Sequence, residues 1–166
     1  MIVGENHEGR AFDMTSRLFF KYWMPVIAWM AVIFAASGDM MSAEHTSRFI
    51  GPFLRWFAPD ISPATIASVQ FFVRKAAHLT EYAILGALLV RAVFFRAGKM
   101  TARYAVAIWL VAVAWAALDE FHQSFVASRT GAPADVMIDA IGALIGLGIY
   151  CWFARGNQAG ARRREG

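Results

Sequence analysis

Two short stretches of the sequence, 74–82 and 119–123, concentrate side chains that can transfer protons or hold a polar ligand. Two further acids, Asp135 and Asp139, follow one helical turn apart. Carboxylates and imidazoles are the usual general acids and bases of enzymes, whereas guanidinium and ammonium groups bind phosphates and carboxylates. The residue types therefore indicate a site that binds a polar group or performs acid–base chemistry on it.

The candidates divide into two roles. The candidate catalytic residues are Glu120, Asp119, His78 and Glu81. The candidate substrate-binding residues are Arg74, Lys75, Tyr82, His122, Gln123, Arg129, Asp135 and Asp139. No serine or cysteine is evidently activated as a nucleophile, which disfavours covalent acyl transfer. No compact motif such as His-Glu-x-x-His occurs, so we assign no metal ligands and no cofactor, although the acids could hold a divalent ion.

The elements that carry these residues are apolar enough to cross a membrane. Apolar residues make up 58% of the 166 residues and charged residues only 17%, against about 45–50% and about 25% in soluble domains. This excludes a disordered chain and disfavours a small soluble enzyme. The single cysteine, Cys151, excludes an internal disulfide and a cysteine-based zinc site.

The sequence predicts an all-α fold, an integral membrane four-helix bundle. Four stretches approach the roughly 20 apolar residues that a span requires, at about 19–37, 76–95, 104–125 and 136–153. They define a transmembrane domain over 19–153, between a polar N-terminal tail, 1–18, and a basic C-terminal tail, 154–166.

The distribution of charge predicts how the spans are oriented. Eleven of the 16 lysines and arginines fall on the side of the two termini, and eight of the 12 acids on the other side. By the positive-inside rule, both termini are cytoplasmic in a multi-pass protein of the bacterial cytoplasmic (inner) membrane. The basic balance thus reflects topology, and we expect no nucleic-acid partner. Ala35-Ala36-Ser37 loosely fits a signal-peptidase site, but the length of the first span favours an uncleaved helix.

The first external connection, 38–74, predicts two helical segments. A helix starting near Ser42 carries Phe49, Phe53, Trp56 and Phe57 at helical spacing, with an interruption at Gly51-Pro52. Such an amphipathic segment should lie at the outer membrane interface. Ser62-Pro63 then predicts the N-terminus of a helix that continues into the second span, about 33 residues or roughly 50 Å in all. Gly98 predicts the C-terminal cap of this helix.

The charged residues within the spans should converge in the bundle interior. Counted from the cytoplasmic arginines, Glu81, Asp119 and Asp139 fall in one layer, roughly 22–24 Å up. A charge facing lipid there costs roughly 2.5–3.5 kcal/mol, so we expect these residues to line a cavity open to the external side. The alternative is a set of buried ion pairs that fixes helix register. Gly142 and Gly146 form a Gly-x-x-x-Gly pattern, which we assign to packing within one bundle rather than to a dimer.

The same residues resemble the VanZ-like family of small bacterial membrane proteins. The resemblance rests on Arg74-Lys75-Ala-Ala-His78-Leu-Thr-Glu81-Tyr82-Ala-Ile-Leu85-Gly86 and on Asp119-Glu120-Phe-His122-Gln123-Ser-Phe125, and continues through Arg129, Asp135, Asp139, Gly142 and Gly146. The stretch Ile33-Phe34-Ala-Ala-Ser37 is also similar. The resemblance implies a multi-helix membrane protein, and the family's name-giving member is associated with resistance to the glycopeptide teicoplanin.

Three classes of function fit this pattern. The first is an enzyme acting on an envelope lipid or lipid-linked precursor in the outer leaflet. The second is a module that binds such a precursor, or a glycopeptide-related ligand, without chemistry. The third is a proton- or ion-coupled carrier, for which the cytoplasmic halves of the spans offer almost no polar residue besides Arg91.

Overall fold

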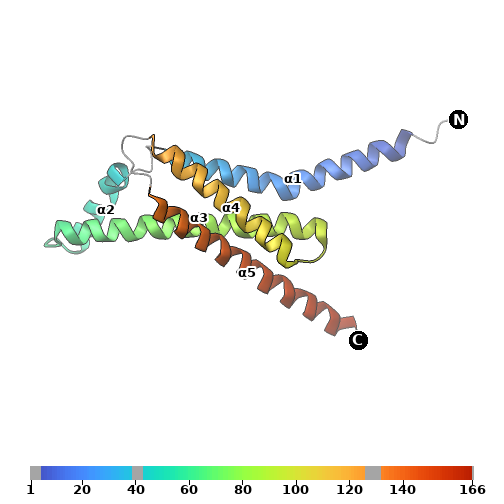
Figure 1. Cartoon of the computed structure of the whole chain (residues 1–166). Helices are drawn as coiled ribbons and strands as arrows, with labels where there is room; N and C mark the ends of the chain where they lie inside the picture. The colour runs from blue at the N-terminus through green and yellow to red at the C-terminus, as the bar shows by residue number, and fades with distance from the viewer. Residues whose placement is uncertain (1–4, 39–42, 126–131, 166) are drawn as a thin grey trace.

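The computed structural model describes residues 5–38, 43–125 and 132–165. Within these ranges the chain forms five α-helices and no strand (Figure 1). The helices are α1 (Glu5–Ala36), α2 (Ala43–Phe57), α3 (Pro63–Ala97), α4 (Ala102–Gln123) and α5 (Pro133–Glu165). The predicted all-α fold is confirmed.

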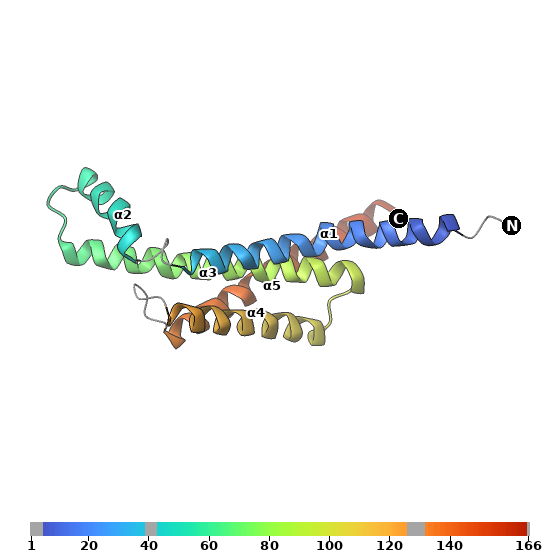
Figure 2. The ribbon, with the colours of Figure 1, turned by 90° about the horizontal axis from the view of Figure 1, so that it is seen from above.

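Four of the helices are long and apolar enough to cross a membrane: Arg17–Ala36 of α1, Pro63–Phe95 of α3, all of α4, and Pro133–Gly156 of α5. Their outer faces expose large apolar side chains, as hydrocarbon contact requires. The protein is therefore a membrane protein with four helices of spanning length. The first described turns of α1 and the last of α5 lie at the same end of the bundle (Figures 1 and 2).

The spanning helices differ in length from the predicted spans. The α3 helix begins at Pro63, well before the predicted span at 76–95 and as the Ser62-Pro63 signal predicts: the Ser62 hydroxyl accepts a hydrogen bond from the Thr65 amide at 3.1 Å. It ends at Gly98, which adopts φ 67°, as the sequence predicts. The basic tail is largely helical, since α5 continues to Glu165, and most of the N-terminal tail belongs to α1.

The α2 helix corrects one prediction and supports another. It runs without a break through Gly51-Pro52, so the predicted interruption is wrong. Here α2 passes close to Ile66 of α3, and the helix tolerates the one backbone hydrogen bond that a proline omits. Four aromatic side chains are exposed, as expected of a helix at a membrane interface; they are Phe49, Phe53, Trp56 and Phe57.

The α3 helix is the centre of the bundle and packs most extensively against α5, then against α1 and α4. In Figure 1, α5 crosses it obliquely, and both views place α2 beside its N-terminal part. The closest approach is made by glycines. A Cβ atom on Gly142 would overlap the carbonyl of Leu79, and one on Gly146 would overlap that of Ala83. The Gly-x-x-x-Gly pattern thus packs within the bundle, which confirms that prediction.

The middle of the bundle is an apolar core. Its residues come from α1, α3, α4 and α5. They include Val26, Ile33, Leu85, Leu89, Val90, Ile108, Ala112 and Ala143. Two tryptophans tie the helices together: the Trp29 indole donates to the Glu81 carbonyl at 2.9 Å, and the Trp109 indole to the Ala140 carbonyl at 3.0 Å. The α1 helix therefore contributes to the core.

Candidate functional site

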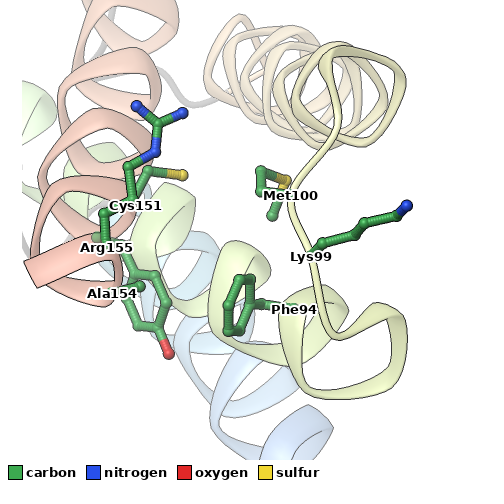
Figure 3. Close-up of a pocket in the computed structure, with 7 residues that line it drawn as sticks. Phe94, Lys99, Met100, Cys151, Ala154 and Arg155 are labelled. Atoms are coloured by element: carbon green, nitrogen blue, oxygen red, sulfur yellow. The ribbon is translucent and has the colours of Figure 1, made fainter. Parts of the chain in front are cut away.

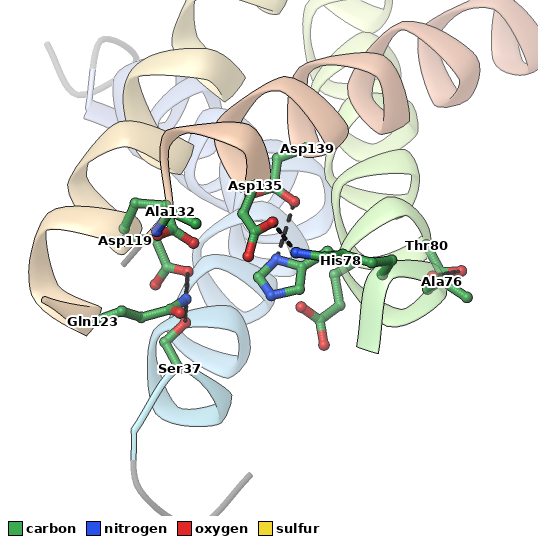
Figure 4. Close-up of polar contacts among 12 residues, drawn as sticks. Ser37, Ala76, His78, Thr80, Asp119, Gln123, Ala132, Asp135 and Asp139 are labelled. Atoms are coloured by element: carbon green, nitrogen blue, oxygen red, sulfur yellow. Dashed lines mark hydrogen bonds and ion pairs between the residues drawn. The ribbon is translucent and has the colours of Figure 1, made fainter. Parts of the chain in front are cut away.

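Polar side chains gather at one end of the bundle, where α1 and α4 end and α5 begins (Figure 4). We call this group the polar cluster. Its members are Ser37, Lys75, His78, Tyr82, Asp119, Glu120, Gln123, Asp135 and Asp139. Its four carboxylate residues are at most 9% exposed. The cluster therefore lies inside the bundle and not on its lipid-facing surface.

Two contacts join α3 to α5. His78 Nδ1 lies 3.1 Å from Asp139 Oδ1, and Asp139 has no exposed surface. One turn earlier on each helix, the Lys75 ammonium pairs with Asp135. Both contacts follow from the helical period, because residues three or four apart lie on one face of a helix. The two helices thus present matched polar faces to each other.

A second network joins the end of α1 to α4. The Ser37 hydroxyl donates to Asp119 Oδ2 at 2.5 Å, and the Gln123 amide donates to the same oxygen at 3.0 Å. The Gln123 amide also lies 3.2 Å from the Ser37 hydroxyl. Next to this network the His122 ring lies against Phe34, with ring centroids 4.3 Å apart. Asp119 is thus held by side chains from two helices.

Glu120 links α4 to the start of α5. Its Oε2 atom accepts a hydrogen bond from the Ala132 amide at 2.7 Å, immediately before Pro133 begins α5. The residue is 7% exposed. Glu120 therefore fixes the N-terminus of α5 through Oε2. Its other oxygen, Oε1, takes no part in this hydrogen bond.

Several buried polar atoms of this region have no hydrogen-bond partner among the residues that the structure describes. They are Tyr82 Oη, Trp115 Nε1, Asp119 Oδ1, Glu120 Oε1, His122 Nδ1 and Asp139 Oδ2. A buried polar atom without a partner costs roughly 1–3 kcal/mol. A site that keeps six of them is suited to a ligand or to water that would supply the missing partners.

Not every candidate from the sequence joins the polar cluster. Glu81 is half-buried and lies within electrostatic range of His78. Arg74 is exposed, and among the described residues it makes no hydrogen bond or ion pair with the cluster; Lys75, about 100° further around the helix, pairs with α5 instead. Arg129 and most of the predicted turn, 128–134, lie outside the described residues.

The structure adds two groups that the sequence reasoning missed. Ser37 bonds to Asp119, and the backbone amide of Ala132 bonds to Glu120. Ser37 stands at the end of the stretch 33–37, which the family resemblance included without giving it a role. The Ala132 contact is made by a backbone amide, a group that almost every residue has, so the spacing of residues in the sequence could not predict it.

One subset of the cluster has the atoms of a metal site. His78, Glu120 and Asp135 each offer one ligand atom, and these atoms lie within 4.8 Å of one another. The residues come from α3, α4 and α5, so the sequence spacing could not single them out as a ligand set.

A separate cavity of about 160 Å³ lies at the opposite end of the bundle (Figure 3). Lys99, Cys151 and Arg155 line it together with aromatic and apolar residues. It contains none of the candidate site residues.

The fold and the polar cluster define a class: a polytopic α-helical membrane protein with ionisable residues packed inside its bundle. The family model described as VanZ/LLP1 matches residues 22–154, and the chain belongs to that family. This confirms the resemblance seen in the sequence. A search of the curated proteins and a search of the solved structures found no match.

Proposed function

We propose that the polar cluster binds the head group of a cell-envelope lipid or lipid-linked precursor at the external side of the membrane, and acts on it. The observation that carries this proposal is the set of buried polar atoms without partners, above all Tyr82 Oη. Such atoms are costly in an apolar bundle, and a bound polar group offsets that cost.

The chemistry of the cluster favours a head group rich in hydrogen-bond donors. Its unpartnered oxygens belong to three carboxylates and one phenol, and a carboxylate only accepts hydrogen bonds when ionised. Sugar hydroxyls and amino groups are donors that match them. A lipid-linked sugar or amino-sugar precursor meets this description, and the teicoplanin resistance associated with the name-giving VanZ protein fits a role in the same envelope chemistry.

The distribution of charge supports an external position for the polar cluster. The polar cluster lies at the end of the bundle opposite the two termini, and lysine and arginine are concentrated on the termini's side. The positive-inside rule therefore supports an external position for the cluster, within reach of head groups in the outer leaflet.

The carrier hypothesis receives less support. Between the cluster and the opposite end, the buried residues that the structure describes are apolar, among them Leu85, Leu89, Val90 and Ala112. A proton or ion path through one chain would need polar groups there. A binding module without chemistry uses the same site and differs only in making no product.

Tyr82→Phe is the sharpest test, because it removes one hydroxyl and keeps the ring. Purified full-length protein is placed in nanodiscs made from the host's envelope lipids, and retained lipids are measured by native mass spectrometry. Loss of one hydrogen bond, about 0.5–1.5 kcal/mol, predicts roughly 2–12-fold weaker retention of a specific lipid. The control is Tyr104→Phe, at an exposed tyrosine far from the cluster.

Equal retention by wild type, Tyr82→Phe and Tyr104→Phe, or no lipid retained above bulk composition, would contradict the proposal. Conversion of the retained lipid during incubation distinguishes an enzyme from a binding module.

A further inference from the structure

Three side chains of the polar cluster form a ligand set. His78, Glu120 and Asp135 contribute one nitrogen and two oxygens from α3, α4 and α5, with the ligand atoms within 4.8 Å of one another. Zinc lies 2.0–2.2 Å from such atoms, so the ligands of a tetrahedral site are about 3.4 Å apart. Side-chain rotations that move each ligand atom by about 1 Å close that gap.

The surroundings of His78 are those of a metal-ligating histidine. Its Nδ1 atom lies 3.1 Å from Asp139 Oδ1, and Asp139 is completely buried. Histidines that bind metals commonly donate their other ring N–H to a carboxylate, which fixes the ring and the tautomer. With Nδ1 turned toward Asp139, Nε2 is left for an ion.

Glu120 supplies a second, independent observation. The residue as a whole is 7% exposed; Oε2 accepts a hydrogen bond from the Ala132 amide, whereas the buried Oε1 has no hydrogen-bond partner among the described residues. A buried carboxylate oxygen held in place by its neighbour and lacking a partner is a ready ligand atom for a cation.

The charge balance also favours a cation. Asp119, Glu120, Asp135 and Asp139 are all buried, and within the described ranges the one ammonium or guanidinium group in contact with them is Lys75, on Asp135 Oδ1. That contact leaves Asp135 Oδ2 available. Buried charges require compensation, and a divalent ion neutralises two further carboxylates.

The geometry points to a binding site for one divalent transition-metal ion, Zn²⁺ or Mn²⁺, ligated by His78, Glu120 and Asp135 and positioned through Asp139. The imidazole favours these ions over Mg²⁺ and Ca²⁺, which prefer oxygen ligands alone. Three protein ligands leave at least one position for water or for an oxygen of a bound molecule. This inference does not depend on the lipid proposal. If both proposals hold, the bound ion supplies a positive charge within the acidic cluster, and this charge binds a phosphate of the lipid head group.

The test measures metal binding by the full-length protein in detergent after treatment with a chelator. Isothermal titration with Zn²⁺ should give one equivalent per chain with Kd below ~100 µM. Asp135→Asn should weaken binding at least tenfold, and Asp139→Asn, at the positioning residue, by about 10–100-fold. The control is Asp60→Asn, which makes the same chemical change at an exposed residue and should bind as wild type does.

A second measurement needs no variant. Electron spin-echo modulation of protein-bound Mn²⁺ should show coupling to one imidazole nitrogen. Wild-type Kd above ~100 µM for both ions, Mn²⁺ without nitrogen coupling, or equal affinity in wild type, Asp135→Asn and Asp60→Asn would overturn the inference. The two proposals can fail separately. Metal binding without lipid retention contradicts only the lipid proposal, and lipid retention without metal binding contradicts only the metal site.

Discussion

Replacing Gly146 by alanine tests whether the contact of α3 with α5 holds the bundle together. A Cβ atom at Gly146 would overlap the carbonyl oxygen of Ala83 and lie 2.9 Å from its Cα, well inside the 3.5–4.0 Å of favourable carbon contacts. The opposing atoms are backbone and cannot rotate away. The helices must therefore separate by several tenths of an ångström or more around this position.

The expected cost follows from two opposing effects. Overpacking typically costs about 1–3 kcal/mol, and the backbone overlap puts Gly146→Ala at the upper end. Alanine is the better helix former by about 0.8–1.0 kcal/mol, which leaves a net destabilisation of about 2 kcal/mol. At roughly 2–4 °C per kcal/mol for a chain of this size, the Tm should fall by about 4–8 °C.

Gly148→Ala is the matched control, two residues along the same helix. No atom lies within 4 Å of its added Cβ, so only helix propensity changes and the Tm should stay the same or rise. Thermal unfolding of the purified protein in one detergent, followed by circular dichroism and by aggregation, measures both variants. If Gly146→Ala unfolds at or above the wild-type temperature, or both variants change equally, α3 and α5 are not packed as described.

Substitutions at three further positions probe helix packing, the polar cluster and a helix cap. Gly142→Ala, whose Cβ would overlap the carbonyl of Leu79, should lower the Tm by a similar amount and speed hydrogen–deuterium exchange around Leu79; unchanged exchange would contradict this. Ser37→Ala removes the 2.5 Å hydrogen bond to Asp119 and should cost about 1–3 kcal/mol, seen as a lower Tm; an unchanged Tm would show that this bond contributes nothing. Gly98→Ala places a side chain at φ 67° and should cost about 1–2 kcal/mol, whereas Gly98→Asn, which tolerates that conformation, should cost less; equal losses would exclude backbone strain as the cause.

The sequence alone predicted the spanning helices and most of the residues that form the polar cluster. Apolar length set the four spans, and local capping at Ser62 and Gly98 set the two ends of α3, because both signals act within a few residues. The spacing of Asp139 from Asp135 also placed these two acids on one helix face. The predicted helix interruption at Gly51-Pro52 is wrong, because glycine and proline lower the local helix propensity, which is a weak guide that the rest of the structure can override.

Only the tertiary structure decided which of these groups meet. Spacing within a helix says which face a side chain occupies, but not how far one helix slides or turns against the next. Here the glycine contacts of α5 with α3 set that register, and it selects Lys75 over Arg74 as the partner of Asp135. The same packing brings Ser37 to Asp119 and brings His78, Glu120 and Asp135 together from three helices. The order of residues along the chain does not predict either of these contacts.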